Sequence, residues 1–324
     1  MGNKISHRII KRKNAFRTNS YPSRDSNTIS TGYNDSSNSQ LVPQLKTVAG
    51  RPYFEENFST YIFPADWEEA DRLQALHFSL KHILDGNYSA PLSNIIKPGS
   101  KILDIGCGPG HWSFEIAQEY PYAEVYGIDI LSSFPNKIKP KNCHFKTCDI
   151  LEGLPFNDNE FDYIFMRHMV ASIKAYQWFS VLKDIKRVLK SGGIIESVEL
   201  NCTPHSIGPV HTQFMKLCND AMSDAFDIDL KLKFEPMFKD LGFQNVTFTS
   251  KYISLGNWGA NAGKIGQIWT TNTVQMAEAV KSILLPHMKL TDDEWDRMFK
   301  TMYFDEVDKY RSYQEHYIVL ATKV

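Results

Sequence analysis

The chain has 324 residues, of which 42% are hydrophobic and 13% aromatic, and its formal net charge at pH 7 is -1. This length is enough for one large α/β domain with additions or for two modest domains, and the near-neutral charge argues against a protein devoted to nucleic acid. No apolar run has the length of a membrane span, and the N-terminus lacks the apolar core of a secretory signal.

The five cysteines are odd in number, and no two of them form a CxxC pair. Cys143 and Cys148 fall in one expected strand region, where they could not easily bridge. We therefore expect no disulfide framework, no metal site and a reducing, cytoplasmic compartment.

Residues 1–45 are rich in serine, asparagine and threonine and contain few apolar residues. Such a segment cannot bury enough surface to offset its loss of conformational entropy, so we expect a disordered tail over residues 1–50. The first six residues, MGNKIS, match the pattern for N-myristoylation at Gly2, and the basic residues within 1–24 would supply a second signal for peripheral membrane contact. The alternatives are a chance match and a nuclear-localisation patch.

The first segment with helical periodicity predicts a helix over 66–85, with Asp66 as its N-cap and Gly86 as its stop. From Ser100 onward, short apolar runs alternate with segments of helical periodicity. The expected strands cover 101–105, 123–128, 142–147, 161–166, 194–200, 243–255 and 316–322, and the expected further helices cover 111–119, 175–190, 204–241, 267–285 and 292–310.

This alternation predicts a parallel sheet with right-handed crossovers, and the continuously apolar strands indicate that both faces of the sheet are covered. We expect one domain over 51–324, with its core at about 99–200. Helical insertions are expected at 204–241 and 256–310, and the second of them separates the last two strands.

Three glycines stand at the turn from the first strand of this core into its helix, in the run KILDIGCGPG at 101–110. Glycine allows a sharp turn there and lets a ligand approach the backbone closely. A dinucleotide fingerprint has the spacing GxGxxG, whereas here the third glycine comes one position early and His111 stands where the last glycine is needed. This spacing disfavours a nicotinamide oxidoreductase.

Three acids accompany the loop: Asp104 precedes the first glycine by two residues, Asp129 ends the second strand, and Asp149 follows the third. An acid at the end of the second strand can accept both hydroxyls of a ribose. Either later acid alone could instead cap a turn or a helix. The complete order, an acid, GxGxG and then two acids, resembles the class I S-adenosylmethionine-dependent methyltransferases.

The resemblance implies S-adenosylmethionine as the cofactor. In that family the acid before the glycines helps to hold the methionine end, which implies this role for Asp104, and Asp129 would bind the ribose. Asp149 would accept from the adenine amino group, with the backbone N–H of Ile150 near the ring. The remaining residues expected to bind the cofactor are Gly106, Cys107, Gly108, Gly110, Ile130 and Arg167.

The resemblance covers about residues 53–324 and is most specific over 100–200. Flanking segments are similar to a fungal methyltransferase group that includes regulators of secondary metabolism, as seen at 61–64, 69–77, 120–129 and 255–258. Ser191 replaces the usual proline of the turn before the fifth strand, which does not depend on it. The implied fold is a Rossmann-like, mostly parallel seven-stranded sheet with an antiparallel last strand, helices on both faces and helical lid insertions.

Methyl transfer from a sulfonium is an in-line displacement, in which the protein supplies binding, alignment and exclusion of water. A base is needed only where the acceptor must lose a proton. His168, His205 and His211 are candidates because they follow the fourth and fifth strands, at the edge where open parallel sheets bind ligands. For each, the alternative is an ordinary surface or hydrogen-bonded histidine. Arg167 could contact a carboxylate of cofactor or substrate, or pair with a nearby acid.

Tyr61 and the helix over 66–85 are candidates for a lid over the cofactor, with Arg72 or His77 facing inward, or for simple packing onto the sheet. The acceptor pocket is expected from insertions, which differ between proteins of one fold. We expect methyl transfer to a small-molecule or protein acceptor. The alternative is a methyltransferase-like regulator that binds cofactor or partners with little turnover. The sequence indicates neither the acceptor nor the oligomeric state.

Overall fold

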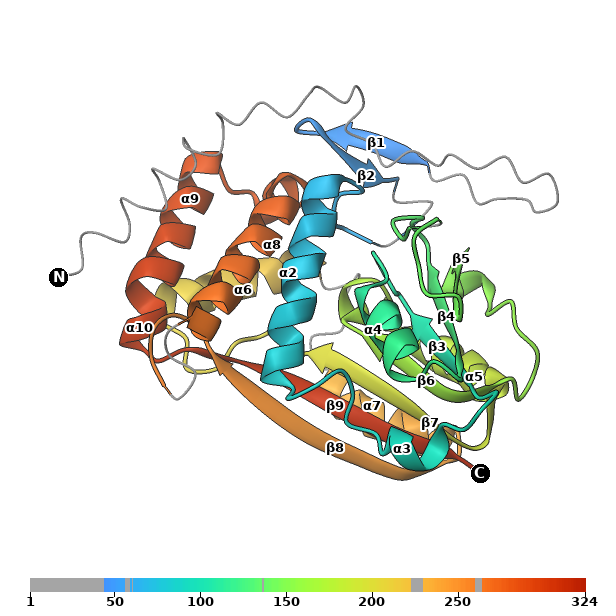
Figure 1. Ribbon diagram of the computed structural model, residues 1–324. Coiled ribbons are helices and arrows are strands. Elements are labelled where there is room, and N and C mark those ends of the chain that lie inside the picture. The colour runs from blue at the N-terminus through green and yellow to red at the C-terminus, as the bar shows by residue number, and fades with distance from the viewer. Residues whose placement is uncertain (1–43, 56–58, 60, 136, 223–229, 260–263) are drawn as a thin grey trace.

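A computed structural model describes residues 44–324 of the chain except 56–58, 60, 136, 223–229 and 260–263 (Figure 1). The expected disorder of residues 1–43, the myristoylation pattern at Gly2 and the basic cluster lie outside the described residues. None of the described helices combines the length and the apolar character that crossing a membrane requires.

Within the described residues, seven strands form one mixed sheet in the order β5-β4-β3-β6-β7-β9-β8. The pairs from β5 to β7 are parallel, whereas β9 runs antiparallel to both of its neighbours. The expected Rossmann-like sheet with an antiparallel last strand is therefore confirmed. The strands are β3 (Lys101–Ile105), β4 (Glu124–Asp129), β5 (Cys143–Thr147), β6 (Phe161–Arg167), β7 (Leu189–Leu200), β8 (Phe243–Ser254) and β9 (Tyr313–Lys323).

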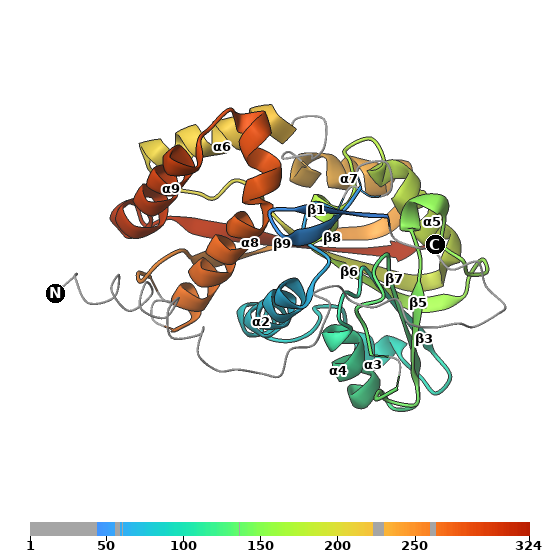
Figure 2. The same ribbon diagram turned by 90° about the horizontal axis from the view of Figure 1, so that it is seen from above.

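The two faces of the sheet carry two separate apolar cores. Helices α5 (Trp178–Val188) and α7 (Leu230–Asp240) cover one face, and Figure 2 shows them opposite α2 (Trp67–Ile83) and α4 (His111–Glu119). A short helix, α3 (Leu92–Ile95), leads from α2 into β3. Because the strands of this central α/β unit, residues 100–200, are buried on both faces, their apolar runs are continuous rather than alternating.

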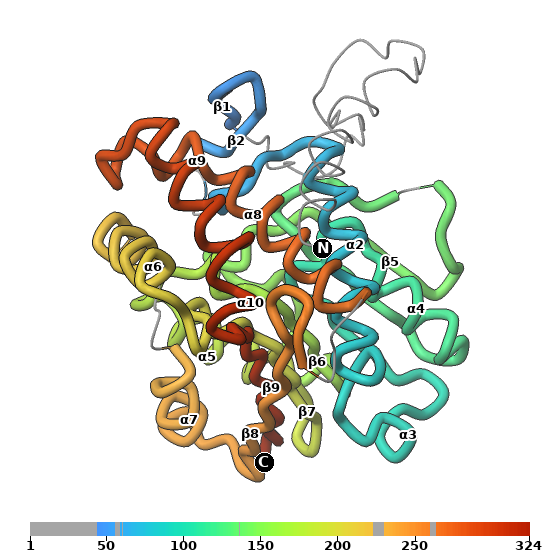
Figure 3. Tube along the Cα trace, turned by 90° about the vertical axis from the view of Figure 1, so that its left-hand side faces the viewer, coloured from blue at the N-terminus to red at the C-terminus, as the bar shows by residue number. Residues whose placement is uncertain are grey.

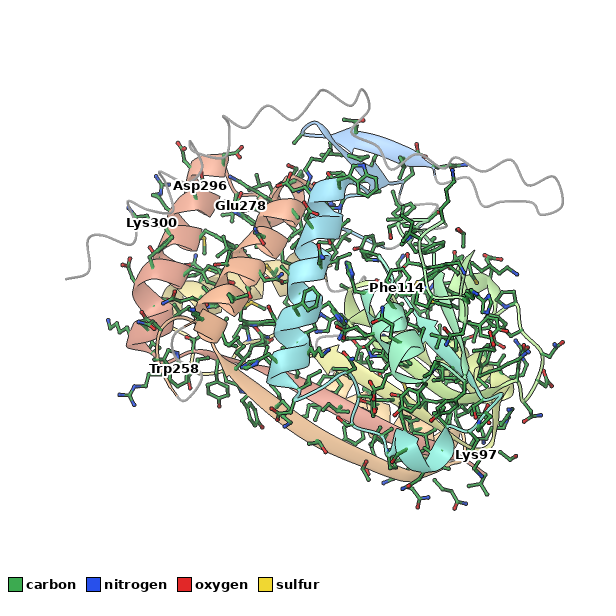
Figure 4. All side chains as sticks on the ribbon, viewed as in Figure 1. Lys97, Phe114, Trp258, Glu278, Asp296 and Lys300 are labelled. Atoms are coloured by element: carbon green, nitrogen blue, oxygen red, sulfur yellow. The ribbon has the colours of Figure 1, made fainter. Side chains whose placement is uncertain are left out.

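A second group of helices extends the face that carries α2. This helical unit consists of α6 (Pro209–Met222), α8 (Lys264–Met288), α9 (Asp292–Lys300), the π-helical turn η3 (Thr301–Glu306) and α10 (Val307–Lys309). Figures 1 and 3 show α8 beside α2, with α6 and α9 farther from the central α/β unit. Figure 4 labels Glu278 of α8 and Asp296 and Lys300 of α9, and all three are exposed.

Helix α2 begins and ends where the sequence predicts. The Asp66 carboxylate accepts from the backbone N–H of Glu69 at 2.9 Å and so caps the first turn, and both of its oxygens also accept from Arg51 at 2.7 Å. The helix stops before Asp85 and Gly86, which have φ angles of 60° and 151°. The left-handed backbone at these positions ends the helical hydrogen-bond ladder.

The expected boundary of the tail at residue 50 is wrong. Strand β1 (Leu45–Val48) pairs with β2 (Arg51–Phe54) in an antiparallel hairpin. Tyr53 and Phe54 are buried, and the Tyr53 hydroxyl donates to the carbonyl of Ala279 in α8 at 2.6 Å. Burial against a helix that lies more than two hundred residues later orders the hairpin, and this partner cannot be seen in the local composition.

Three other expected boundaries change. Helix α5 ends at Val188, and β7 already begins at Leu189, because Leu189 pairs with Phe161 before a bulge that contains Gly192 and Gly193. The expected helix over 204–241 is two helices, α6 and α7. The expected helix over 292–310 widens into the π-helical turn η3. There the Glu306 carboxylate accepts from the first backbone N–H groups of α6 at 2.8 to 3.0 Å.

Candidate functional site

A cavity opens at the carboxyl ends of β3, β4 and β6, where the strand order changes direction. Every residue expected to bind the cofactor lines it except Gly110, which is the N-cap of α4. Two helices beside the sheet, α2 and α4, and the short helices η1 (Ile150–Glu152) and η2 (Met169–Ala171) complete its wall. Topology thus brings together residues that the sequence separates by as many as 63 positions, from Asp104 to Arg167.

The glycine loop adopts a backbone that other residues would strain. Gly106, Gly108 and Gly110 have φ angles of 69°, 51° and 81°. A Cβ on Gly106 would lie 2.4 Å from the sulfur of Met169, and one on Gly110 would lie 2.6 Å from the ring of Phe145. Glycine is required here both for the turn and for the close packing of the loop against its neighbours.

Asp104 lies beneath this loop, at the end of β3. Its carboxylate is 4% exposed and accepts a hydrogen bond from the Ser113 hydroxyl at 2.5 Å. Burial raises the pKa of Asp104 to about 7, although the hydrogen bond from Ser113 and the charge of Arg167 act in the opposite direction. A carboxyl group in this state gains charge readily when a cation is placed beside it.

Asp129 and Asp149 also anchor backbone. The two carboxylate oxygens of Asp129 accept from the N–H groups of Gly108 at 2.8 Å and Leu131 at 2.9 Å. Asp149 caps η1 by accepting from the Leu151 N–H at 2.9 Å. Burial raises the pKa of both carboxyl groups. Asp129 thus stabilises two turns and Asp149 caps a helix, as the alternative interpretation expected, and both acids also line the cavity.

Arg167 ends β6 and projects into the cavity. Its Nη2 atom lies 3.1 Å from Nδ1 of His77, while Nη1 is shielded from solvent and has no hydrogen-bond partner in the described residues. The alternative expectation, an ion pair with a nearby acid, is not met among the described residues. Burial lowers the pKa of Arg167 to about 10, and the guanidinium stays charged at neutral pH.

Helix α2 contributes the wall above the glycine loop. His77 faces the cavity, and Tyr61, which precedes the helix, lines it as well and donates to Glu69 at 3.3 Å. Arg72 does not line the cavity, because its guanidinium pairs with Glu69 at 2.6 Å and reaches Asn272 of α8 at 3.2 Å. Of the two candidate lid residues, His77 faces inward and Arg72 joins the helix to α8.

Comparison with known proteins agrees with this geometry. Residues 102–193 match a family model described as a methyltransferase domain. Residues 102–193 therefore carry a methyltransferase domain, for which S-adenosylmethionine is the cofactor.

Curated relatives of this methyltransferase domain are fungal. The chain is 34% identical over 152 residues to the secondary metabolism regulator laeA of Coprinopsis cinerea, which covers 45% of this chain and 37% of the relative. It is 29% identical over 194 residues to the regulator of the same name in Aspergillus flavus, with 56% and 51% covered. It is 29% identical over 171 residues to the protein-methionine methyltransferase laeA of Emericella nidulans, with 52% and 44% covered. The match thus spans about half the length of these relatives or less.

Solved structures of methyltransferases are among those that the chain matches. Phosphoethanolamine N-methyltransferase 2 of Haemonchus contortus is 18% identical, with a TM-score of 0.47 and coverage of 84% of this chain and 61% of that one. A methyltransferase of Archaeoglobus fulgidus is also 18% identical, with a TM-score of 0.43 and coverage of 80% and 100%.

The three histidines considered as bases lie in different places relative to this methyltransferase site. His168 lines the cavity, directly after Arg167. His205 lies outside it, where its ring stacks on Tyr313 and its Nε2 atom is 3.3 Å from the Glu315 carboxylate. His211 is buried in α6 against Tyr303, and burial lowers its pKa to about 4. The structure thus places only His168, of the three, at the cavity.

Two groups of site residues lie beyond what the motif analysis found. The first is the pair Leu73 and Leu76 on the inner face of α2, which line the cavity beside the expected His77. The second is Met169, whose sulfur packs on Gly106. The helical spacing could have identified the first group, whereas the second depends on a contact across the sheet edge.

Glu199 positions the short helix η2 without lining the cavity itself. The side chain is fully buried on β7, and its carboxylate accepts from the backbone N–H groups of Met169 at 3.2 Å and Val170 at 3.0 Å. Burial raises the pKa of Glu199 to about 8. Through these bonds Glu199 holds η2, and with it the segment that follows Arg167.

Proposed function

We propose that this chain transfers the methyl group of S-adenosylmethionine to a small-molecule or protein acceptor. The observation that carries the proposal is a single cavity lined by Asp104, Asp129 and Asp149 together with the glycine loop. Asp104 takes the ammonium of the methionine end, because it is a buried carboxyl group poised to ionise beside a cation. The backbone of Gly106, Cys107 and Gly108 lies along the cofactor.

The residues at the ends of β4 and β5 would bind the ribose and the adenine of the cofactor. Asp129 uses one acceptor site on each oxygen for backbone N–H groups, and an ionised carboxylate offers about four such sites. Two sites therefore remain for the two ribose hydroxyls, with Ile130 beside them. Asp149 keeps acceptor sites for the adenine amino group, and the N–H of Ile150 faces the ring edge.

Arg167 binds the carboxylate of the methionine end. Its guanidinium is charged, its Nη1 atom is shielded from solvent, and no described acid pairs with it. A charged donor held in this way gains from an anion, because a hydrogen bond to an ionised group is stronger than one between neutral groups. Asp104 and Arg167 would thus hold the two charges of one amino acid moiety.

Catalysis by this arrangement is mainly alignment. When bound, S-adenosylmethionine supplies an activated methyl carbon. The lone pair of the acceptor forms the new bond to this carbon while the carbon–sulfur bond breaks and its electron pair stays on sulfur. The chain's residues hold the two ends of the cofactor and keep water out, with α2 and η2 closing the cavity on two sides. No side chain of the site needs to become covalently attached.

A second function is a regulatory protein that binds cofactor or partners with little turnover. The observation that favours it is the name given to several fungal relatives, which are described as secondary metabolism regulators. The relative from Emericella nidulans, named a protein-methionine methyltransferase, favours a protein as the acceptor. The two functions differ in turnover and not in cofactor binding.

One experiment separates the two functions. The full chain is titrated calorimetrically with S-adenosylmethionine and then incubated with methyl-labelled cofactor and fractionated cell extract. Labelled acceptor in a small-molecule, lipid or protein fraction supports the enzyme. The same measurements on Asp129→Ala test the cavity, and Asp240→Ala, which changes an exposed acid of α7, is the matched control. Binding without label transfer supports the regulator, and absence of cofactor binding contradicts the enzyme and leaves only a regulator that acts through partners.

We also propose that the chain acts in the cytoplasm, with reversible membrane contact through a myristoylated Gly2 and the basic residues that follow it. A single acyl chain binds membranes weakly, so the basic residues are needed as a second signal. Mass spectrometry of the native N-terminus tests this: an unmodified Gly2 or a retained Met1 contradicts it, and nuclear staining would support the alternative use of the basic patch.

A further inference from the structure

Next to the cofactor cavity, three aromatic side chains from distant parts of the chain meet. His168 follows β6, His316 lies on β9, and Trp269 lies on α8. The rings of His168 and His316 stack with centroids 5.3 Å apart and 13° between their planes. The ring of Trp269 meets His316 edge-on at 4.8 Å. We call these three residues the imidazole–indole cluster.

The polar atoms of the imidazole–indole cluster are buried without partners. Nε2 of His168, both ring nitrogens of His316 and Nε1 of Trp269 have no hydrogen-bond partner in the part of the chain that the structure describes. His316 is 0% exposed and Trp269 is 3% exposed. An unmet buried donor or acceptor lowers stability. Four such atoms in contacting rings therefore indicate a place that is built to hold a polar ligand.

The cluster continues the cofactor cavity toward the helical unit. His168 lines the cavity beside Arg167 and Met169, and its backbone is held in the left-handed region at φ 58° while its N–H donates to Val198 at 2.9 Å. Backbone strain of this kind persists only where the surroundings enforce it, and it is common at functional sites. His316 lies on β9, two strands beyond β6 and farther from β5, the strand that Asp149 follows at the end proposed for adenine.

Two other buried indoles lack a partner in the described residues, but their surroundings differ. Trp178 packs on Phe234 in the core beneath α5, and Trp295 packs on Phe214 and Phe299 within the helical unit. In the part of the chain that the structure describes, neither indole has a ring contact with a histidine. Trp269 differs from them because its neighbour is an imidazole in contact with the cavity wall.

The chemistry of the cluster favours an uncharged hydroxyl. Burial lowers the pKa of His316 to about 3 and that of His168 well below its usual range, so both rings are neutral at physiological pH. A neutral imidazole offers one donor and one acceptor, and an indole offers a donor. A hydroxyl group both donates and accepts, which matches this set. The charge of Arg167 next to His168 disfavours an ammonium group.

We propose that the imidazole–indole cluster is the acceptor subsite of the methyltransferase and that it takes a phenolic ring. The phenolic ring would lie in the cavity against His168, which lines it, and its hydroxyl would reach the buried, unpartnered nitrogens of His316 and Trp269. The proposal rests on the proposed methyl transfer, since it assigns the acceptor of that same cavity. The cluster is proposed to bind the acceptor and not to take part in the reaction itself. The subsite would hold the ring next to the cofactor's methyl group.

Small probes test the subsite. The full chain, labelled with ¹⁵N in its histidine rings and saturated with S-adenosylhomocysteine, is titrated with phenol, benzoate and benzylamine while the ring nitrogen signals are followed by NMR. We expect phenol to saturate and shift the His168 and His316 signals, with a Kd at least tenfold below those of benzoate and benzylamine. Tighter binding of benzoate or benzylamine, or no saturable shift with phenol, would overturn the proposal.

Variants locate the binding. Trp269→Phe keeps an aromatic ring and removes the N–H, and His316→Phe removes both ring nitrogens. Each variant is expected to bind phenol at least fivefold more weakly and to change the affinity for S-adenosylhomocysteine less than twofold. Trp295→Phe is the matched control and leaves phenol binding unchanged. If Trp269→Phe binds phenol like the wild type, the subsite is elsewhere. If the cofactor product does not bind, the proposed function fails instead, and phenol titration of the chain alone still tests the subsite.

Discussion

The central α/β unit and the helical unit are held together in different ways. In the central unit, the site residues follow successive strands of one sheet, and many bonds of the site, such as Asp129 to Gly108 and Asp149 to Leu151, join residues that are close in the chain or on adjacent strands. The helical unit is joined to the rest through partners far apart in sequence. Arg72 bonds Asn272, and Tyr53 bonds Ala279. Local pattern encodes the first unit, and tertiary contact defines the second.

The difference suggests a division of labour. The central unit would determine cofactor affinity, because all the proposed cofactor contacts come from it. The helical unit and β9, which contribute Trp269 and His316 to the proposed acceptor subsite, would determine which acceptor reaches the methyl group. Substitutions in one unit should therefore leave the property of the other unchanged, and the following predictions test that separation.

The largest expected effect comes from the core of the helical unit. Trp295 is 0% exposed and packs against Phe214 and Phe299. Trp295→Ala leaves a cavity and should lower the free energy of unfolding by about 3–5 kcal/mol, measured by denaturant titration. The folded variant should bind S-adenosylmethionine within twofold of the wild type. Trp67→Ala, at a residue that is 57% exposed, should change stability by less than about 0.5 kcal/mol. A large loss of cofactor affinity in folded Trp295→Ala would show that the units are coupled.

The next effect concerns the ribose contact. Asp129→Ala removes the proposed acceptor of both hydroxyls and releases the N–H groups of Gly108 and Leu131. Because hydrogen bonds to charged groups contribute about 1.5–3 kcal/mol each, S-adenosylmethionine affinity measured by calorimetry should fall roughly 30-fold or more. Asp240→Ala should bind normally. Unchanged affinity in Asp129→Ala would remove this residue from the cofactor site.

Substitution of Arg167 should lower cofactor affinity somewhat less, and it distinguishes a contact with the cofactor from a contact with the acceptor. Arg167→Met removes one charged contact and should weaken S-adenosylmethionine about tenfold, equivalent to about 1.4 kcal/mol. Arg167→Lys keeps the charge but loses the planar fork, so it should recover part of the affinity. If cofactor affinity stays constant while the KM for an identified acceptor rises, Arg167 belongs to the acceptor side and the division between the units moves to β6.

The smallest effect is a pH dependence. The pKa of Asp104 is raised to about 7 by burial, and the cofactor ammonium binds only the ionised form of the carboxyl group. Affinity should therefore rise about fivefold from pH 6 to pH 7 and level off by about pH 8. Asp104→Asn should bind more weakly at pH 7 and show no such rise. An equally steep profile in Asp104→Asn would assign the titration to another group.

The sequence predicts the central unit well because its signals are local. Asp66 as an N-cap and the strands beside the glycine loop follow from residues within a few positions of one another. The wrong boundaries have tertiary causes. The hairpin at 45–54 is ordered by Ala279, and β7 begins early because Leu189 pairs with Phe161. No window along the chain contains those partners.

The site divides in the same way. Asp104, Asp129 and Asp149 could be found from their order along the chain, and the structure places all three at the cavity. Glu199 could not be found, since its function depends on the backbone of η2, which only the sheet brings near. His316 lay inside an expected strand, and nothing in its neighbourhood along the sequence signals that its ring stacks on His168.

Strand β9 has a consequence for how the molecule is made. It is inserted between β7 and β8 although it follows both of them along the chain. Its alternating side chains face both sides of the sheet, with Glu315 bonded to Lys231 of α7 and His316 stacked on His168. While the chain is still emerging from the ribosome, the glycine loop and its acids can already fold together. The gap between β7 and β8 stays open until residues 313–323 arrive. The order of synthesis therefore delays the proposed acceptor subsite, which includes His316, until after the glycine loop and its acids have been made.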